Sequence, residues 1–309
     1  MRALRWTTGV ALALTFGVIV LGAWVRATAS GLSCPDWPTC YGHWVPLPGD
    51  IPADAGYSYF QVMLEWVHRL LVGVALGPLI LLIGWLAWRV RDQSPRMPLH
   101  AGALILLLLV QAGLGGLTVL DQNSPWSVAL HLSTALLLFS VLWLIFARAT
   151  GTAMGASGAV RTLSVLLWLL VLGAMASAAM TTKSGAALAC STWPLCDGAL
   201  IPDLSDPGVR LNFSHRLLAA GVGIGALALH LACRSQPALK RLSALVLALA
   251  VTEIGFGALV VLWQVPIATA IAHQAMGVLT FGAISLLMWR AGAPVSDAET
   301  LHVRRLSRA

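Results

Sequence analysis

The chain has 309 residues, of which 58% are hydrophobic and 10% charged, and its formal net charge is +7. A soluble globular domain has about half apolar and about a quarter charged residues, so this composition excludes one and indicates an integral membrane protein. The cationic residues follow the boundaries of the apolar runs, so we interpret the net charge as a topology signal and expect no nucleic acid partner.

Eight apolar runs are long enough to cross a bilayer as helices, which need about 20 residues each. They cover residues 8–25, 62–88, 99–120, 126–147, 163–180, 211–233, 242–263 and 267–289. Runs of this length favour helices over barrel strands, so the predicted fold class is an all-α integral membrane protein. The first run could also be a cleaved signal peptide, but it exceeds the apolar region of about 7 to 15 residues that such signals have.

The distribution of Lys and Arg predicts the orientation of these spans. If the N-terminus is cytoplasmic, 14 of the 19 cationic residues lie on the cytoplasmic side. This bias predicts that both termini are cytoplasmic. The long loops at 26–61 and 181–210 then lie outside, in a compartment where disulfides persist.

The two halves of the chain contain the same features in the same order. In the first half these features are, in order, Cys34 and Cys40, His68-Arg69, Gln111 and His131. Their counterparts in the second half are, in the same order, Cys190 and Cys196, His215-Arg216, Glu253 and His273. Each half has an even number of spans, so both halves enter the membrane from the same side. We therefore predict two four-helix bundles arranged as parallel repeats, at residues 1–150 and 151–309.

Four of the five cysteines form two Cys-x5-Cys segments in the outer loops, each with Trp-Pro at its centre. A disulfide between Cys34 and Cys40, and another between Cys190 and Cys196, would each close a small loop. The pairs could be structural staples, or redox-active pairs, because exposed short-loop disulfides are labile. The spacing is not that of a zinc or thioredoxin-like site.

Four histidines lie at a similar depth, about four to seven residues inside the outer ends of their spans, or roughly 6 to 10 Å. They are His68, His131, His215 and His273. A single intramembrane histidine usually serves a hydrogen bond between helices. Two in each half, on alternate spans of a bundle, favour haem iron ligation. Glycines on the neighbouring spans, including Gly115 and Gly257, would leave room for a flat ring.

Arg69 and Arg216 lie at the same depth and suit the propionate carboxylates of a haem. Each follows a candidate ligand directly and therefore points about 100° away from it on a helix. Each arginine could bind the propionates of a haem or extend to lipid phosphate.

Glu65 lies three residues before His68, on the same helix face, so its carboxyl group is expected to face a ring held by His68 and His131. Burial is expected to raise its pKa and allow proton exchange near neutral pH. The counterpart in the second half is Asn212, which cannot exchange a proton in this way. The difference predicts a reactive site in the first half and an unreactive haem in the second. The role of Glu253, the other intramembrane acid, stays open between proton path and packing.

The motifs that carry a family resemblance are Ser30-Gly-Leu-Ser-Cys-Pro-Asp-Trp-Pro38, Glu65-x-x-His68-Arg69, His131, His215-Arg216 and His273. Together they make the chain resemble the haem A synthase family over nearly its whole length. The resemblance implies a membrane oxidoreductase that converts the C8 methyl of haem O to a formyl group. The second half departs from the simplest family pattern by also carrying Cys190 and Cys196.

The resemblance further implies that His68 and His131 hold the substrate haem, that Glu65 assists the chemistry, and that a haem b cofactor binds in the second half. The ligands of this haem b are expected to be His215 and His273. The expected partners are haem O, a haem O synthase, a terminal oxidase assembly pathway and membrane lipid, and the expected location is the bacterial inner membrane. The electron donor and a homo-oligomeric state stay open.

Two other functions account for part of these features. A b-type electron carrier with two haems that oxidises quinol would use the four histidines but leaves Glu65 without a role. A transporter with rocking repeats would place its polar groups near the bilayer centre, whereas here they lie near the outer face.

Overall fold

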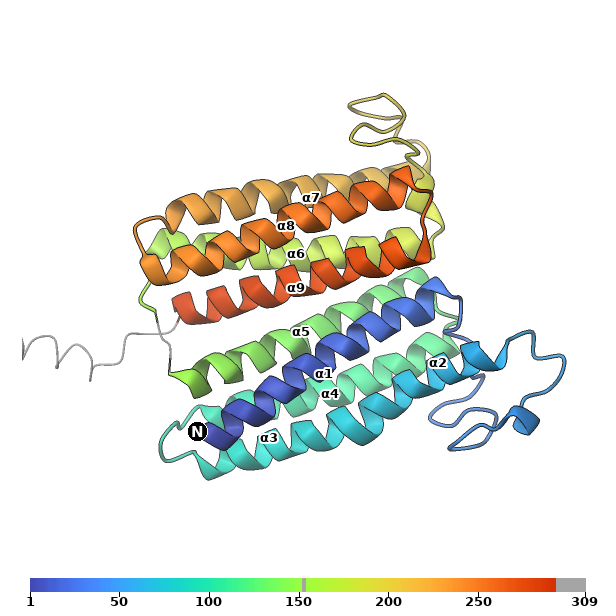
Figure 1. The fold of residues 1–309 in the computed structure, drawn as a ribbon, viewed down its shortest axis with the longest axis horizontal. Helices are drawn as coiled ribbons and strands as arrows, with labels where there is room; N and C mark the ends of the chain where they lie inside the picture. Colours follow the sequence, from blue (N-terminus) through green and yellow to red (C-terminus); the bar gives the residue numbers. More distant parts are fainter. Residues whose placement is uncertain (152–153, 293–309) are drawn as a thin grey trace, which may run out of the picture.

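The computed structural model describes residues 1–151 and 154–292 of the chain (Figure 1). This described part contains eight helical segments long and apolar enough to cross a membrane, which confirms the predicted number of spans. The first four are α1 (Arg2–Ala27), α2 to α3 (Tyr59–Arg89), α4 (Met97–Leu120) and α5 (Pro125–Thr150). The other four are α6 (Gly158–Lys183), α7 (Pro207–Ala232), α8 (Pro237–Leu262) and α9 (Ile267–Gly292). Residues 293–309 of the predicted second half lie outside the described residues.

Capping residues explain where several helices begin. The side chains of Ser58, Ser124, Ser157 and Asp206 accept hydrogen bonds from backbone amides in the first turns of α2, α5, α6 and α7. Such caps satisfy amides that have no partner within the helix. Proline in the first turn of α5, α7 and α8 has the backbone angle that a helix needs.

The second span differs from the uninterrupted helix that its apolar run suggests. It consists of α2 (Tyr59–Leu70), a π-helical segment η2 (Leu71–Leu76) and α3 (Gly77–Arg89). Short π-helical segments are rare and often lie at functional sites. Here the segment follows His68 and Arg69 directly, so it changes the helix register beside two of the predicted site residues.

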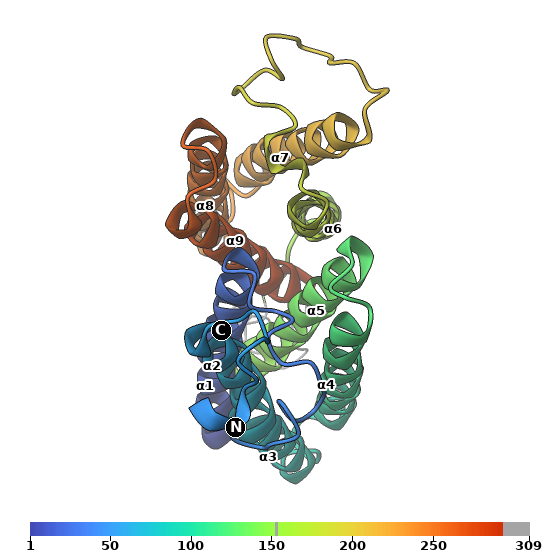
Figure 2. The ribbon, with the colours of Figure 1, turned by 90° about the vertical axis from the view of Figure 1, so that its right-hand side faces the viewer.

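The helices form two groups, seen end-on in Figure 2, with α1 to α5 in one and α6 to α9 in the other. Helices α1 and α5 of the first group pack against α6 and α9 of the second through the pairs α1–α9, α5–α6 and α5–α9. Two tryptophans connect the groups by hydrogen bonds. Trp168 Nε1 donates to Ser140 Oγ of the first group at 3.2 Å, and Trp289 Nε1 donates to the Ser140 carbonyl at 2.9 Å. Within the second group, Trp168 Nε1 also donates to Ser285 Oγ at 2.9 Å.

The two long loops lie at the same end of the molecule, and the N-terminus lies at the opposite end (Figure 1). Each loop has a disulfide, Cys34–Cys40 in the first and Cys190–Cys196 in the second, with the pairing that the sequence predicts. Each also has a cis peptide bond between its Trp and Pro residues. Short 3-10 helices, η1 (Pro48–Asp50) and η3 (Ala186–Leu188), lie in the same loops.

Candidate functional site: a cavity with two histidines and a second histidine pair

A cavity of about 580 Å³ lies within the first group of helices. Ligand sites typically have about 300–1,000 Å³ and mostly apolar walls with a few polar groups. The walls come mainly from α1, α2, η2, α4, α5 and the adjoining loops, and α6 and α9 of the second group each contribute one residue. The polar members of these walls include Glu65, His68, Arg69, Gln111 and His131. The structure thus brings both predicted histidines of the first half and the predicted acid to one cavity.

His68 reaches the cavity from α2 and lies against α1. A Cβ atom added to Gly22 of α1 would lie 3.2 Å from His68 Cε1, so any larger residue there would press against the imidazole ring. The Nδ1 atom of His68 is buried and has no hydrogen-bond partner among the described residues. Buried polar atoms are normally paired, so this unpaired nitrogen fits a ring that serves as a metal ligand.

His131 reaches the same cavity from α5, and its ring lies beside Gly115 of α4. Gln111 Nε2 lies 3.1 Å from His131 Nδ1, while the buried Oε1 of Gln111 has no partner within the described chain. Turning the Gln111 amide by 180° would let its Oε1 accept a hydrogen bond from His131 Nδ1–H. The Nε2 atom of His131 would then be free to bind a metal. The residues present therefore fit a haem iron between α2 and α5.

His215 and His273 face each other from α7 and α9, with ring centroids 6.3 Å apart and ring planes at 78°. Because metal–imidazole bonds are about 2 Å long, two rings on opposite sides of one metal have centroids about 6 Å apart. The pair therefore fits a single haem iron.

The Nδ1 atoms of this pair have partners that orient the rings. His215 Nδ1 lies 2.9 Å from Ser177 Oγ. His273 Nδ1 lies 3.1 Å from the Glu253 carbonyl oxygen and 3.4 Å from the Glu253 carboxylate. A partner at Nδ1 fixes the tautomer in which Nε2 binds a metal.

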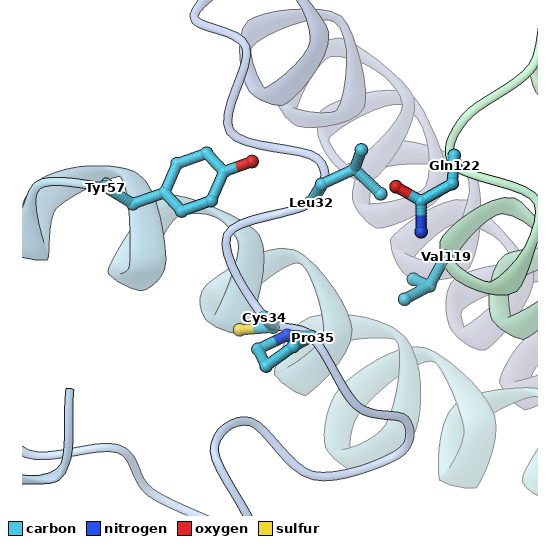
Figure 3. A pocket seen from close by; sticks show the side chains of 6 residues that line it. All are labelled: Leu32, Cys34, Pro35, Tyr57, Val119 and Gln122. Carbon is cyan, nitrogen blue, oxygen red and sulfur yellow. The ribbon is translucent and has the colours of Figure 1, made fainter. Parts of the chain in front are cut away.

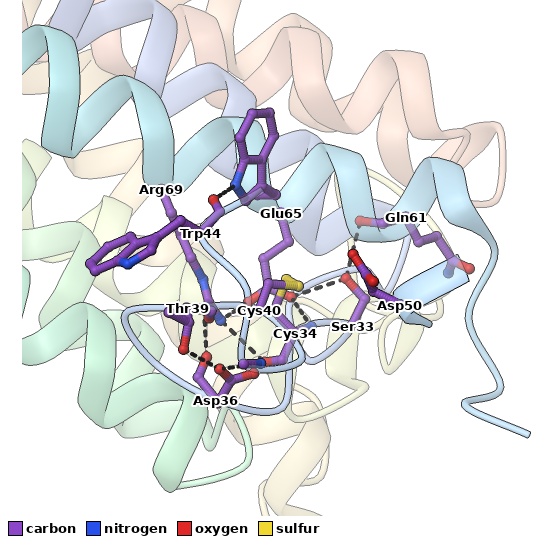
Figure 4. The surroundings of a disulfide bond; sticks show 12 residues. Ser33, Cys34, Asp36, Thr39, Cys40, Trp44, Asp50, Gln61, Glu65 and Arg69 are labelled. Carbon is purple, nitrogen blue, oxygen red and sulfur yellow. Dashed lines mark hydrogen bonds and ion pairs between the residues drawn. A yellow bond between two sulfur atoms is a disulfide. The ribbon is translucent and has the colours of Figure 1, made fainter. Parts of the chain in front are cut away.

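Glu65 and Arg69 connect α2 to the first loop (Figure 4). Glu65 Oε2 accepts hydrogen bonds from the Ser33 hydroxyl and the Cys34 amide, both at 3.0 Å, and Glu65 Oε1 lies 2.5 Å from Arg69 Nη2. The same guanidinium donates to the carbonyl oxygens of Cys34, Asp36 and Thr39. Arg69 therefore holds the disulfide loop against the end of the cavity nearest the long loops.

Asn212 and Arg216 form the same arrangement in the second half. Arg216 Nε donates to Asn212 Oδ1 at 2.8 Å. Its other nitrogens donate to the carbonyl oxygens of Cys190, Thr192, Pro194 and Leu195. The propionate contacts predicted for Arg69 and Arg216 stay a prediction, because the structure shows both side chains bound to loop carbonyls.

The four disulfide sulfurs are shielded: Cys34, Cys40 and Cys190 are 0% exposed and Cys196 is 3% exposed. Exchange with an external thiol requires access to a sulfur atom, so these loops would have to open before they could react. A second, smaller cavity of about 190 Å³ lies beside Cys34 and Pro35, between Tyr57 and the Val119–Gln122 turn (Figure 3).

Asp36 shows how polar groups order the first loop. Burial raises the pKa of Asp36, but hydrogen bonds from the Thr39 hydroxyl and the Gly42 amide outweigh this effect, so the pKa lies below its ordinary value. The side chain is therefore an ionised acceptor near neutral pH, which keeps the loop closed around the disulfide.

The cavity wall also contains polar residues that were not predicted as site residues, among them Arg26 at the end of α1, Lys183 at the end of α6 and Gln274 in α9. Arg26 Nη2 donates to Gln274 Oε1 across the two groups of helices. Arg26 and Lys183 are two of the five cations that do not follow the orientation bias. Their position on the side of the membrane with few cations was the signal in the sequence that could have identified them. Only the fold shows that they lie in the same cavity wall.

Comparison with known proteins agrees with these motifs. The COX15-CtaA family model, described as cytochrome oxidase assembly protein, matches residues 5–285. The chain is 29% identical to the haem A synthase of Shewanella oneidensis, over 95% of this chain and 99% of that protein. It is 31% identical to the haem A synthase of Symbiobacterium thermophilum, over 94% and 95% of the two chains. For the haem A synthase of Geobacillus kaustophilus, the identity is 29% over 96% of each.

Proposed function

The chain belongs to the COX15-CtaA family of cytochrome oxidase assembly proteins and is a haem A synthase of the bacterial inner membrane, and we propose how its two halves divide the reaction. Haem O is the substrate, and the haem A product serves a terminal oxidase pathway. The reaction oxidises the C8 methyl group of haem O to a formyl group.

In this proposal His68 and His131 hold haem O, and His215 and His273 hold a haem b cofactor. The cavity supports the first assignment, because it contains both histidines and has room for a ligand. The 6.3 Å separation of the second pair supports the other. Haem b held by His215 and His273 would supply electron transfer to the reaction in the first half.

Glu65 is the proposed catalytic residue, and the comparison with Asn212 carries this assignment. Both residues accept a hydrogen bond from the arginine that holds the adjacent loop. Since an amide suffices for the arginine contact in the second half, pairing with Arg69 alone does not require the carboxylate of Glu65. The second carboxylate oxygen of Glu65 also accepts from Ser33 and Cys34. Glu65 also lines the cavity, where its negative charge can accept a proton or stabilise positive charge beside the methyl group.

The test is Glu65→Gln, which keeps the size of the side chain and removes its charge. We expect the purified variant to contain both haems but to accumulate haem O or its hydroxymethyl form, as measured by mass spectrometry of the extracted porphyrins. Full conversion to haem A by Glu65→Gln would contradict the catalytic assignment. Haem b alone in the wild-type extract would instead support an electron carrier.

Asn212→Asp provides the matched control in the second half. It keeps an acceptor for Arg216 and removes the hydrogen bonds that Asn212 Nδ2 donates to the Ala186 and Ala187 carbonyls. We expect normal conversion because Asn212 is remote from the substrate. The alkylation state of Cys34 and Cys40 reports whether Glu65→Gln has loosened the loop. Loss of conversion with an intact disulfide supports chemistry at Glu65, whereas loss together with a reduced disulfide supports a structural role.

The proposal includes the finer topology. The halves 1–150 and 151–309 are parallel repeats with both termini in the cytoplasm, and the loops with the two disulfides lie outside. The arrangement of the long loops at one end of the molecule and the N-terminus at the other supports this orientation. We assign the disulfides a structural role, because all four sulfurs are shielded. The haem O synthase is the proposed supplier of the substrate, while the electron donor and the oligomeric state are left unassigned.

A further inference from the structure

Arg26 and Lys183 form a cationic rim on the cavity, close to the ends of the helices that lead into the two long loops. Arg26 is in the last turn of α1, and Lys183 is the last residue of α6. The rim therefore combines a residue of the first half with a residue of the second. Gln274 of α9 completes it, as the acceptor of a hydrogen bond from Arg26.

The rim has positive charge that the described residues do not balance. Glu65 is the only acid among the cavity-lining residues, and Arg69 pairs with it. No ion pair of Arg26 or Lys183 occurs in the described chain. A cation held in a membrane-spanning segment without a counter-charge is costly, so a ligand that carries anions would stabilise this arrangement.

Arg69 and Arg216 have more hydrogen-bond acceptors within the protein than Arg26 and Lys183 have. Each of them donates to several loop carbonyls. The only hydrogen-bond partner of the Arg26 side chain in the described part of the chain is the neutral amide of Gln274. A neutral amide is a weaker partner for a guanidinium than a carboxylate, which makes charge-assisted and often bidentate hydrogen bonds. A carboxylate entering the cavity can therefore displace Gln274.

We infer that Arg26 and Lys183 bind the two propionate carboxylates of the porphyrin substrate and so fix the rotation of the ring about its iron. This inference rests on the proposed function, in which His68 and His131 hold the iron. Two histidines define the iron position and the plane of the ring, but they leave the ring free to rotate within that plane. Charged contacts at one edge determine which methyl group faces Glu65.

The second half thus contributes directly to the substrate site. Gln274 follows His273, a proposed haem b ligand, in α9. Occupation of Arg26 by a propionate would release Gln274 beside that ligand. Arg26 and Lys183 are positioning residues in this account, because they determine the orientation of the ring without contacting the reacting methyl group.

The test compares two probes, iron protoporphyrin IX and its dimethyl ester, in titrations of the purified protein with haem b in its second half. The ester has the same ring and iron but has neutral methyl esters in place of the two propionate carboxylates, and the control variants account for the added methyl groups. We expect wild type to bind the free acid at least about 10-fold more tightly than the ester, because hydrogen bonds to charged groups are strong. Arg26→Gln and Lys183→Gln should each reduce this ratio, and the double variant should bring it close to one.

Arg210→Gln is the matched control, since Arg210 is an exposed cation of α7 that does not line the cavity. Arg210→Gln should keep the wild-type acid-to-ester ratio. Arg26→Lys, which keeps a positive charge, should have a ratio between those of Arg26→Gln and wild type. An unchanged absorbance of the haem b in the second half shows that a variant is folded. A wild-type acid-to-ester ratio in the folded double variant would overturn the inference.

The proposed function has a separate test in the same titration. His68→Ala should abolish the binding of both probes to the first half. If both probes bind His68→Ala as they bind wild type, the proposed substrate site is wrong. If His68→Ala fails to bind but the double variant keeps its preference for the acid, only the role of the cationic rim is wrong.

Discussion

The guanidinium groups of Arg69 and Arg216 show how single side chains hold an entire loop. Each donates to at least three backbone carbonyls of a disulfide loop and to a side chain four residues earlier in its own helix. A planar guanidinium has five donors in a fixed geometry, whereas a lysine has a single ammonium group. The positive charge alone therefore cannot replace this arrangement.

Arg69→Lys should consequently expose the first disulfide. Loss of hydrogen bonds to a charged group costs about 1.5–3 kcal/mol each, so we expect Cys34 and Cys40 to be reduced at least about 10-fold faster under mild reductant. Quantitative alkylation and mass spectrometry would measure both disulfides in one sample. The Cys190–Cys196 pair should be unaffected, because Arg216 holds it.

Arg216→Lys is the reciprocal control, and it should accelerate reduction of Cys190–Cys196 alone. Equal protection of both disulfides in the two variants would show that the arginines do not stabilise the loops. The sequence predicts that Glu65 lies on the face of His68, but the pairing of Glu65 with Arg69 is not among the predictions. The loop partners of Arg69 were not predictable either, because carbonyl groups are common to all residues and only the folded loop brings them to α2.

Between neighbouring helices, three imidazoles lie close to a glycine. The distances from an added Cβ atom to the imidazole Cε1 are 3.2 Å for Gly22 and His68, 3.3 Å for Gly115 and His131, and 3.0 Å for Gly257 and His273. The sequence suggested that Gly115 and Gly257 leave room for a flat macrocycle. In the structure these glycines lie directly beside the histidine rings, so they determine how closely the helices approach.

Gly257→Ala should therefore displace the His273 ring and weaken haem binding in the second half. Overpacking costs about 1–3 kcal/mol, so we expect about a 10-fold loss of affinity, measured by absorbance as haem is removed by a competing haem-binding protein. Gly255→Ala is the matched control on the same helix, because an added methyl group there meets open space. Equal affinities of the two variants would exclude this role of Gly257.

The number of helices was predictable, and their local geometry was less so. Hydropathy alone determined the eight spans, because a bilayer requires about 20 apolar residues for each helix. The π-helical segment Leu71–Leu76 was not predictable, since its residues suit an α-helix equally well. Ser177 was missed for another reason: it lies in α6 and meets His215 only because α6 packs against α7.

For the molecule as a whole, the contact between the two groups of helices is central. Ser140 in α5 accepts hydrogen bonds from tryptophans of α6 and α9. Close to it, an added Cβ atom at Gly282 of α9 would lie 2.9 Å from Phe139 Cε1 and from Trp143 Nε1 of α5. Such close packing requires glycine at this position.

Gly282→Leu should separate α9 from α5 and destabilise the whole protein. We expect a loss of about 1–3 kcal/mol from overpacking, seen as a lower Tm of the detergent-solubilised holoprotein. Gly102→Leu, at a position where an added Cβ meets open space, should leave Tm unchanged. An equal Tm for the two variants would mean that the contact adds little stability.

The recognition of main-chain oxygens by Arg69 and Arg216 has a consequence for evolution. Every residue type offers the same carbonyl group, so the side chains between the cysteines can change without loss of these anchoring contacts. The exterior surface of each loop can therefore diversify, for example to suit a different redox donor, while the architecture beneath it is preserved. Engineering of that surface should tolerate many substitutions as long as the two arginines and the loop-ordering Asp36 are kept.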